Sequence, residues 1–189
     1  MEDRLVGKRY QVIEPLGAGS MGTVYRAQDR LTGQMVAIKQ VNVPTERIEH
    51  GSRGAGDDPR IALAQEFRIL ASLRHPNIIS VLDYGFDEAR QPYVTMELLD
   101  HAVTVLEAGE NQPLDVKIDL VVQMLQALTY LHRRNVLHRD LKTSNVLCVN
   151  GVVKLLDFGL SVINGQASSN EIAGTPNYMA PELWLGDPA

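Results

Sequence analysis

The apolar positions in the first hundred residues fall into short runs that are typical of β-strands. β-branched and aromatic residues dominate these runs, and turn-forming residues separate them. A turn containing Gly85 and Pro92 is predicted to join the last two runs. The predicted strands cover residues 10–15, 23–27, 34–41, 75–83 and 93–99.

A different spacing follows the third predicted strand. Residues 44–58 are polar and glycine-rich, which predicts a surface insertion. Asp58-Pro59 then forms a typical helix start, an N-cap followed by proline at the first helical position. The next apolar residues recur at helical spacing, and Glu66 shares their face. These apolar residues are Leu63, Phe67 and Leu70.

The second half of the chain begins with the pattern of a long helix between Pro113 and Asn135. Its apolar stripe has alternating spacings of four and three residues, which predicts packing along one side. Val136-Leu137 is predicted to be a short strand, and Asn150-Gly151 to be the turn of a hairpin formed by residues 146–149 and 152–156. The stripe consists of Leu114, Ile118, Val121, Leu125, Leu128 and His132.

Two motifs around this hairpin carry candidate chemistry. His138-Arg-Asp-Leu-Lys-Thr-Ser-Asn145 precedes it, and Asp157-Phe-Gly159 follows it. By chance the four specified positions of the first motif would occur at about one start site in 160,000, and the second motif at about one in 8,000. Either motif alone could be a polar turn between strands. Both in this order indicate a phosphoryl-transfer site.

Phosphoryl transfer explains the types of residue in these motifs. Asp140 can orient an attacking hydroxyl group and accept its proton, and Lys142 can place a positive charge near the transferred phosphate. Asn145 and Asp157 offer the oxygen ligands that Mg²⁺ prefers. We therefore expect Asn145 and Asp157 to be the metal ligands.

With these residues the sequence resembles Hanks-type (eukaryotic-like) protein kinases of the serine/threonine branch, a type that bacteria also encode. The resemblance runs from about Tyr10 to Glu182. It implies an α+β, bilobal kinase-like fold with a five-stranded small lobe containing one helix, and a mainly helical large lobe. It also implies ATP and Mg²⁺, or Mn²⁺, as cofactors. Thr143 stands where the family often has proline, and we expect this change to matter little.

The resemblance assigns a nucleotide site to the first lobe. A lone G-x-G-x-x-G is also the dinucleotide fingerprint, but that fingerprint requires a helix directly after the glycines, and here a β-rich run follows. The expected phosphate-covering loop is Leu16, Gly17, Ala18, Gly19, Ser20, Met21 and Gly22. The adenine pocket is expected to comprise Val24, Ala37, Met96, the backbone of Glu97 and Leu99, and Leu147. Met96 could equally be a plain core residue.

Lys39 and Glu66 complete the set of catalytic residues that the resemblance implies. A lysine within an apolar strand is costly unless it is paired, and Glu66 is the expected partner that aligns Lys39 with the α- and β-phosphates. The alternative is an edge lysine whose ammonium group reaches water. Arg139 suggests control by phosphorylation, with Ser169 or Ser168 as candidate self-phosphorylation sites, although a solvated loop explains these serines as well.

Composition excludes several other classes of protein. The net charge is −5, without the basic blocks that indicate binding to nucleic acid or to an anionic membrane. No apolar run approaches the roughly 20 residues of a membrane-spanning helix. Cys148 is the only cysteine, which rules out an intrachain disulfide. A cytoplasmic protein in a reducing compartment is therefore expected.

Three functional readings remain open. The strongest is a protein serine/threonine kinase with a signalling role, in which residues 1–99 form the small lobe and hinge and residues 100–189 form the first part of the large lobe. The later helices of the large lobe are expected to lie outside these residues, in a longer protein with further domains. The other two readings are a nucleotide-binding pseudokinase and an inactive fragment that serves as a binding module.

Overall fold

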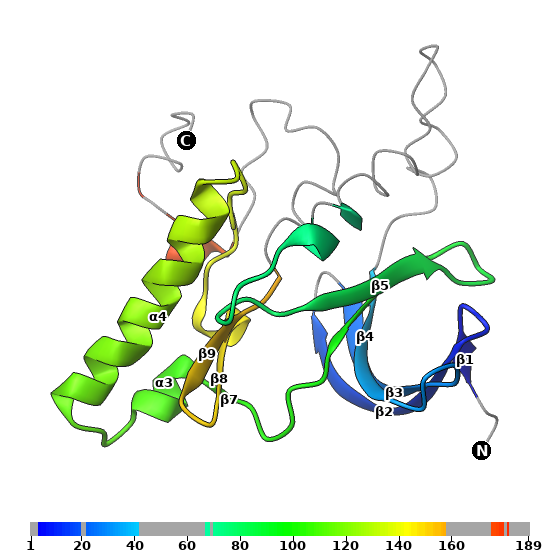
Figure 1. The fold of residues 1–189 in the computed structure, drawn as a ribbon, viewed down its shortest axis with the longest axis horizontal. Coiled ribbons are helices and arrows are strands. Elements are labelled where there is room, and N and C mark those ends of the chain that lie inside the picture. The colour runs from blue at the N-terminus through cyan, green and yellow to red at the C-terminus, as the bar shows by residue number, and fades with distance from the viewer. Residues whose placement is uncertain are drawn as a thin grey trace, which may run out of the picture. The chain divides into compact units, whose positions relative to one another are not determined.

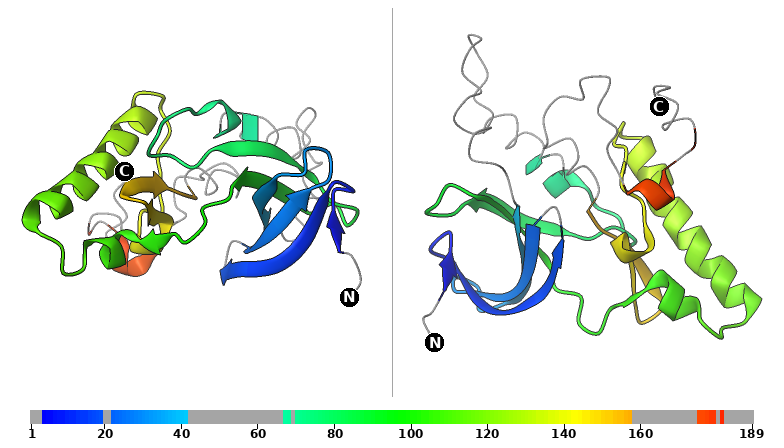
Figure 2. Two further views of the ribbon diagram at one scale, coloured as in Figure 1. Left: turned by 60° about the horizontal axis from the view of Figure 1, so that its bottom comes forward. Right: turned by 180° about the vertical axis from the view of Figure 1, so that it is seen from behind.

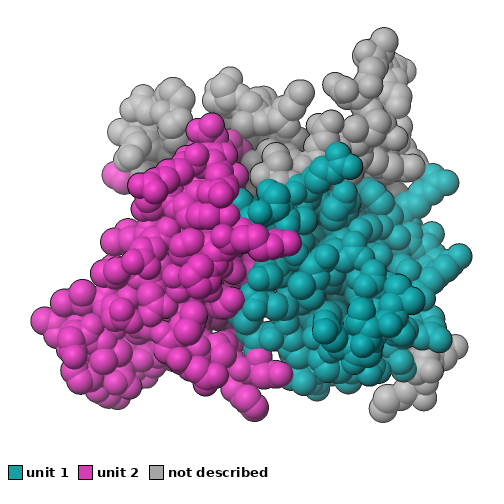
Figure 3. Space-filling model, in the orientation of Figure 1, with its two compact units in different colours: residues 1–73, 80–99 teal, residues 74–79, 100–189 magenta. Residues whose placement is uncertain are grey.

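The computed structural model describes residues 4–19, 22–41, 67–68, 70–157, 175–179 and 181. The chain forms two compact units, which Figure 3 shows in separate colours. Unit 1 consists of residues 1–73 and 80–99, and unit 2 consists of residues 74–79 and 100–189.

Unit 1 is built on a six-stranded antiparallel sheet with strand order β1-β2-β3-β4-β6-β5 (Figure 1). Two register shifts within β2 interrupt its pairing with β3, and such bulges increase the local twist of a sheet. The strands are β1 (Leu5–Val6), β2 (Tyr10–Gly19), β3 (Gly22–Asp29), β4 (Met35–Val41), β5 (Val81–Phe86) and β6 (Pro92–Glu97).

Alternation along these strands gives the sheet two different faces. Val36 and Ile38 of β4 point into an apolar core, and paired residues on β3 and β6 lie on the same face. Ala37 and Lys39, which alternate with them, therefore lie on the opposite face. The core cluster is Val6, Tyr10, Ala27, Val36, Ile38 and Tyr93.

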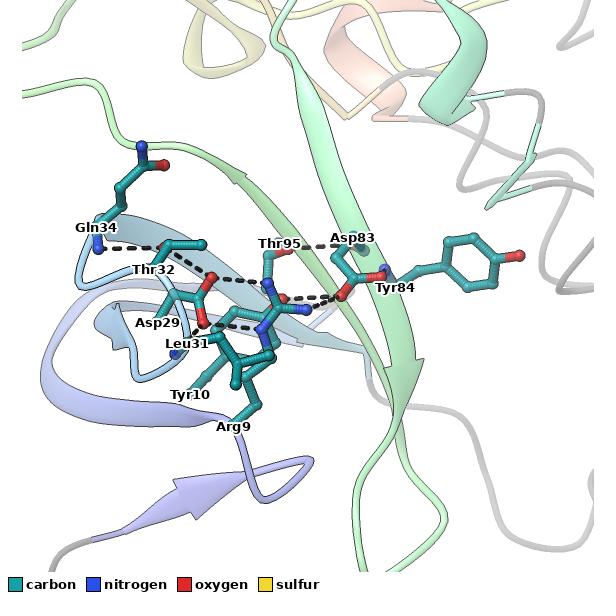
Figure 4. A network of polar contacts seen from close by, with 9 residues as sticks. All are labelled: Arg9, Tyr10, Asp29, Leu31, Thr32, Gln34, Asp83, Tyr84 and Thr95. Atoms are coloured by element: carbon teal, nitrogen blue, oxygen red, sulfur yellow. Dashed lines mark hydrogen bonds and ion pairs between the residues drawn. The ribbon is translucent and has the colours of Figure 1, made fainter.

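A polar network on the core side joins strands that are not neighbours in the sheet (Figure 4). Both oxygens of the buried Asp29 carboxylate accept from Arg9, at 2.8 and 2.7 Å. The same guanidinium group donates to Asp83 on β5 at 2.8 Å, and the Tyr10 hydroxyl group donates to the same Asp83 oxygen at 3.0 Å. Leu31 N and Thr32 Oγ1 donate to Asp29 as well. The network thus connects the start of β2 to β5.

The fold of unit 1 corrects three sequence predictions. The sheet has six strands and not five, because the short β1 pairs with β2. The fourth predicted strand begins at Val81 and not at residue 75. Gly85 lies within β5 and Pro92 is the first residue of β6, so neither lies in the turn between these strands. An added Cβ at Gly85 would meet the Tyr93 hydroxyl oxygen at 2.7 Å.

Only part of the predicted helix of unit 1 lies within the described residues. Residues 67–68 and 70–72 are helical, and Phe67, Leu70 and Leu73 are buried as the apolar stripe predicts. Phe67 stacks on Tyr84 of β5 with a ring-centroid distance of 5.3 Å. The insertion 44–58, the helix start at Asp58-Pro59, Leu63 and Glu66 lie outside the described residues.

Unit 2 combines a small sheet with helices, and α4 packs against β9 (Figures 1 and 2). Its antiparallel sheet has the order β7-β8-β9. A capping box formed by Thr104 and Glu107 starts α3. The elements are β7 (Val103–Thr104), α3 (Val105–Gly109), α4 (Leu114–His132), the 3₁₀ turn η1 (Thr143–Asn145), β8 (Val146–Val149), β9 (Val152–Leu155) and the 3₁₀ turn η2 (Pro176–Tyr178).

The long predicted helix is present as α4, but its buried face differs from the prediction. Leu120, Ala127 and Leu131 are buried, and four members of the predicted stripe are about half exposed or more. These four are Leu114, Ile118, Val121 and Leu125. The helix ends at His132, and Val136-Leu137 is not a strand. No helix in the described part of the chain is long and apolar enough to span a membrane.

Residues 74–79 belong to unit 2, although they follow the helix of unit 1. Leu155 N donates to Asn77 O at 2.9 Å, and Ile79 N donates to Leu155 O at 3.0 Å. The Asn77 side chain donates to Val153 O at 3.0 Å and to Gln123 Oε1 of α4 at 2.9 Å. These bonds to β9 and α4 explain why the run 75–79 does not extend β5.

Candidate active site

The predicted hairpin is confirmed, and it fixes the loop that carries the first motif. Asn150 and Gly151 have φ values of 50° and 78°, the left-handed conformations of a two-residue hairpin turn. After β9, Leu156 N donates to Asn145 O at 2.9 Å. Because Asp157 is the next residue, this bond brings the end of the first motif close to the start of the second.

Asp140 lies at the centre of a cluster of donors in unit 2. Lys142 Nζ lies 2.7 Å from Asp140 Oδ2, and Thr175 Oγ1 donates to Asp140 Oδ1 at 2.6 Å. Lys142 Nζ also donates to Thr175 Oγ1 at 3.1 Å. Asn145 Nδ2 donates to Asp140 Oδ2 at 3.2 Å and to Asp140 O at 2.9 Å. One carboxylate thus holds both an ammonium group and a threonine hydroxyl group.

The electrostatics of the cluster keep this carboxylate ionised. Burial alone raises the pKa of Asp140, but hydrogen bonds from Lys142 and Thr175, the charge of Lys142 and the bond from Asn145 outweigh it. The pKa of Asp140 consequently lies below its ordinary value. At neutral pH Asp140 is a charged proton acceptor, and an ammonium group lies next to it.

Asn145 and Asp157 suit a hard cation. The Asn145 amide directs its nitrogen at Asp140, so its carbonyl oxygen is left for another partner. Asp157 has a φ of 56°, an uncommon backbone conformation for a residue with a side chain. Among the described residues no group of three or more His, Cys, Asp or Glu could hold a metal ion. Mg²⁺ does not require one, because it keeps several waters and takes few protein ligands.

His138 and Arg139 flank the cluster with opposite exposures. His138 is buried, and burial lowers its pKa, so the imidazole is neutral at pH 7. Arg139 is exposed and has a φ of 61°. The regulatory role that the sequence suggests for Arg139 stays a prediction.

In unit 1, strand register places the predicted nucleotide-binding side chains on one face of the sheet. Lys39 pairs with Val24 on β3 and with Val94 on β6, and Ala37 pairs with Met96. Paired residues share a face, so Val24, Ala37, Lys39 and Met96 all lie opposite the core cluster. Lys39 is 3 % exposed, which excludes the alternative of an edge lysine in water.

Different physical reasons explain why glycine stands at particular positions of the β2–β3 hairpin. At Gly22, with a φ of 137°, an added Cβ would meet the carbonyl oxygen of Gln40 at 2.0 Å, so packing against β4 requires glycine. Around Gly17 and Gly19, apart from the adjacent residues of the chain, no atom of the described residues comes within 4 Å of an added Cβ. Packing within unit 1 therefore does not explain Gly17 and Gly19, and close approach of a ligand to the backbone would.

The remaining residues of the predicted nucleotide site differ in exposure. Leu16 and Ala18 are exposed on β2, whereas Glu97, Leu99 and Leu147 are half-buried. Glu97 N donates to Ser80 O at 3.0 Å, so this N–H group is already engaged within unit 1. The predicted residues Ser20, Met21, Glu66, Ser168 and Ser169 lie outside the described residues.

Two contributors to the site could not be identified from motifs alone. Tyr178 lies 3.1 Å from the Thr143 hydroxyl group, a contact between segments 35 residues apart. Gln123 bridges α4 to the hairpin by accepting from Val153 N at 2.9 Å and donating to Gly151 O at 3.0 Å. A glutamine in the middle of a helix carries no sequence signal for either bond.

Comparison with known proteins agrees with this geometry. The family described as "Protein kinase domain" matches residues 10–188. The chain is 38 % identical to the serine/threonine-protein kinase TIO of Arabidopsis thaliana, over 92 % of this chain and 13 % of the relative. It is 34 % identical to the probable serine/threonine-protein kinase PknB of Lactococcus lactis, over 98 % and 29 % respectively.

A probable serine/threonine-protein kinase of Streptomyces coelicolor is 33 % identical over 98 % of this chain. The chain spans 28 % of the length of that relative, so it spans less than a third of each of these three proteins. The matched family nevertheless covers nearly the whole of this chain. The chain belongs to the protein kinase family.

Proposed function

We propose that this chain carries the catalytic part of an ATP-dependent protein serine/threonine kinase with a signalling role. The observation that supports this most directly is the bond from Thr175 Oγ1 to Asp140 Oδ1, 2.6 Å long. It is the bond that a serine or threonine acceptor must make to a catalytic carboxylate before it attacks phosphorus.

In this proposal four residues of unit 2 divide three tasks among them. Asp140 orients the acceptor hydroxyl group and takes its proton as the new oxygen–phosphorus bond forms and the bond between the γ-phosphorus and the leaving oxygen of ADP breaks. Lys142 keeps a positive charge beside the transferred group. Asn145 and Asp157 hold Mg²⁺, or Mn²⁺, which when bound neutralises charge on the phosphate oxygens.

Most of the residues that bind the nucleotide in this proposal belong to unit 1, and Leu147 belongs to unit 2. The backbone around Gly17 and Gly19 approaches the phosphates, and Lys39 pairs with the α- and β-phosphates while Glu66 orients it. Val24, Ala37, Met96 and Leu147 contact the adenine, and the Glu97 carbonyl group and Leu99 backbone hydrogen-bond to it. The shared face of Val24, Ala37, Lys39 and Met96 supports this assignment.

Phosphoryl transfer from ATP to dephosphorylated casein tests the proposal. Asp140→Asn should lower the transfer rate by at least about 100-fold, because a positioned general base contributes on the order of 10²–10⁴. ATP affinity, measured by calorimetry, should change little, and Asp115→Asn on the exposed start of α4 is the matched control. Wild-type protein that binds ATP but transfers no phosphate would instead be a nucleotide-binding pseudokinase or binding module.

A further inference from the structure

Thr143 makes a contact that proline, the common residue of the family at this position, could not make. Its hydroxyl oxygen lies 3.1 Å from the Tyr178 hydroxyl oxygen. Thr143 is the first residue of η1, and Tyr178 is the last residue of η2. The contact therefore joins the loop that carries Asp140 to the segment that follows Thr175.

The segment 175–179 is consequently attached to the loop at two points. At one end, Thr175 contacts Asp140 and Lys142. At the other end, Tyr178 contacts Thr143. Between them the turn is closed by its own hydrogen bonds, from Tyr178 N to Thr175 O at 2.9 Å and from Met179 N to Pro176 O at 3.2 Å. Because the turn is closed, holding Tyr178 also restricts Thr175.

We propose that Thr143 is a positioning residue, whose hydroxyl group holds segment 175–179 against the loop of Asp140 and thereby sets the affinity for the protein acceptor. This inference rests on the proposed kinase function. An acceptor hydroxyl group must reach Asp140, where Thr175 already donates to Oδ1, so the position of this segment limits how the acceptor approaches.

The exposure of the two partners argues against a purely stabilising role. Tyr178 is 52 % exposed and Thr143 is only half-buried. A hydrogen bond between neutral, solvent-accessible groups contributes little to the free energy of unfolding. The Thr143–Tyr178 hydrogen bond should instead restrict the motion of segment 175–179 and strengthen binding of the acceptor.

The backbone at this position allows a clean set of variants. Lys142 has φ −149° and ψ 163°, the extended conformation that a residue preceding proline prefers. The first position of a helical turn also tolerates proline. Thr143→Pro should therefore fold and lose only the side-chain contact. Thr143→Val removes the hydroxyl group at nearly constant shape, Thr143→Ser keeps it, and Tyr178→Phe removes the other partner.

Amide hydrogen exchange of Thr175 and residues 177–179 measures the attachment without turnover. Exchange should rise about three- to tenfold in Thr143→Val, Thr143→Pro and Tyr178→Phe, the range expected for one neutral hydrogen bond. Thr143→Ser should stay close to wild type. The double variant Thr143→Val/Tyr178→Phe should exchange no faster than either single variant, because both remove the same bond.

Transfer kinetics measure the functional consequence. The KM for dephosphorylated casein should rise about two- to fivefold in the variants that lose the bond, with the KM for ATP nearly unchanged. Thr143→Ser should restore the wild-type value. Thr129→Val, which removes an exposed hydroxyl group from α4, is the control for loss of a hydroxyl group elsewhere in unit 2.

Two results would overturn the inference. Unchanged exchange in Thr143→Val and Thr143→Pro would mean that the contact does not hold the segment. Raised exchange with an unchanged KM for casein would mean that the contact is structural only. If the wild-type chain transfers no phosphate, the proposed kinase function fails, and the exchange rates still decide whether Thr143 anchors the segment.

Discussion

Among the described residues, each unit contains one buried aspartate paired with a cation, and the two pairs differ in how they are held. Asp29 in unit 1 receives a two-pronged contact from Arg9 and further bonds from Leu31 N and Thr32. Asp140 in unit 2 receives single contacts from Lys142, Thr175 and Asn145. The Asp29 carboxylate has a donor for nearly every lone pair, whereas Oδ1 of Asp140 can accept one more hydrogen bond.

This difference separates a structural ion pair from a reactive one. The planar guanidinium fork locks Asp29 in place and remains charged at any working pH. A lysine ammonium group is a point charge on a flexible stem, so it can follow charge that moves during a reaction. Burial of an aspartate beside a cation therefore does not by itself indicate catalysis, and the number and kind of donors decide between the two roles.

The largest effect expected from this comparison is on stability. Arg9→Met leaves the Asp29 carboxylate buried and without its main partner, which should lower the free energy of unfolding by about 2–3 kcal/mol. This loss is smaller than the roughly 3–5 kcal/mol typical of a fully buried ion pair, because the Arg9 side chain is 31 % exposed. Arg30→Met, at an exposed arginine next to Asp29, is the control and should cost less than about 0.5 kcal/mol in urea titrations.

The pH dependence of unfolding gives a second test of the Arg9–Asp29 pair. The hydrogen bonds from Arg9 hold the pKa of Asp29 well below its ordinary value, despite the opposing effect of burial. The stability that this pair contributes is therefore complete above the unfolded-state pKa of about 4 and is lost as the pH falls below it. Arg9→Met should unfold with a shallower dependence on pH in this range, and an equal slope in both proteins would contradict the comparison.

Exchanging the two cations should have intermediate effects of different kinds. Arg9→Lys should cost about 1–2 kcal/mol of stability, because one ammonium group cannot reach both Asp29 oxygens and Asp83.

Lys142→Arg should lower the rate of phosphoryl transfer about tenfold with little change in stability, since a guanidinium fork would occupy both Asp140 oxygens. A Lys142→Arg variant with full activity would show that the flexible single contact is not needed.

The smallest effects are expected from two matched hydroxyl groups. Thr32 donates to Asp29 at 2.9 Å and Thr175 donates to Asp140 at 2.6 Å. Thr32→Val should cost about 0.5–1 kcal/mol of stability and leave transfer unchanged. Thr175→Val should reduce transfer about threefold to tenfold.

The pH dependence of transfer distinguishes these two variants. Because the Thr175 hydrogen bond lowers the pKa of Asp140, its removal should move the acid limb of the kcat/KM profile to higher pH. Thr32→Val should leave that limb in place. Equal profiles for Thr175→Val and wild type would mean that Thr175 does not influence the charge of Asp140.

The sequence predicted those parts of the fold that depend on local signals. The Asn150-Gly151 turn and the long α4 follow from turn chemistry and helical spacing. The buried face of α4 did not follow, because the helix has apolar residues on more than one side and only its contact with β9 selects Leu120, Ala127 and Leu131. The two-residue β1 gave no detectable pattern, and it pairs with β2 through a turn in which Lys8 has a positive φ.

The candidate site shows the same division between local and distant information. Motif spacing predicted that Asp140, Lys142 and Asn145 belong to one site, and the structure brings them together within one loop. Motif spacing did not reveal the contact of Thr143 with Tyr178, because that contact forms only where two turns distant in sequence meet. The start of β5 was predicted wrongly for a similar reason, since Asn77 and Ile79 bond to β9 and not to the first sheet.

The assignment of residues 74–79 to unit 2 has a consequence for dissecting the molecule. The polypeptide crosses from one unit to the other three times, after residues 73, 79 and 99, so neither unit is a continuous piece of sequence. A fragment ending at Leu99 would retain Asn77 but lose the Val153 carbonyl group and the Gln123 side chain to which it donates. Excising the first sheet by itself would thus require a linker in place of those six residues.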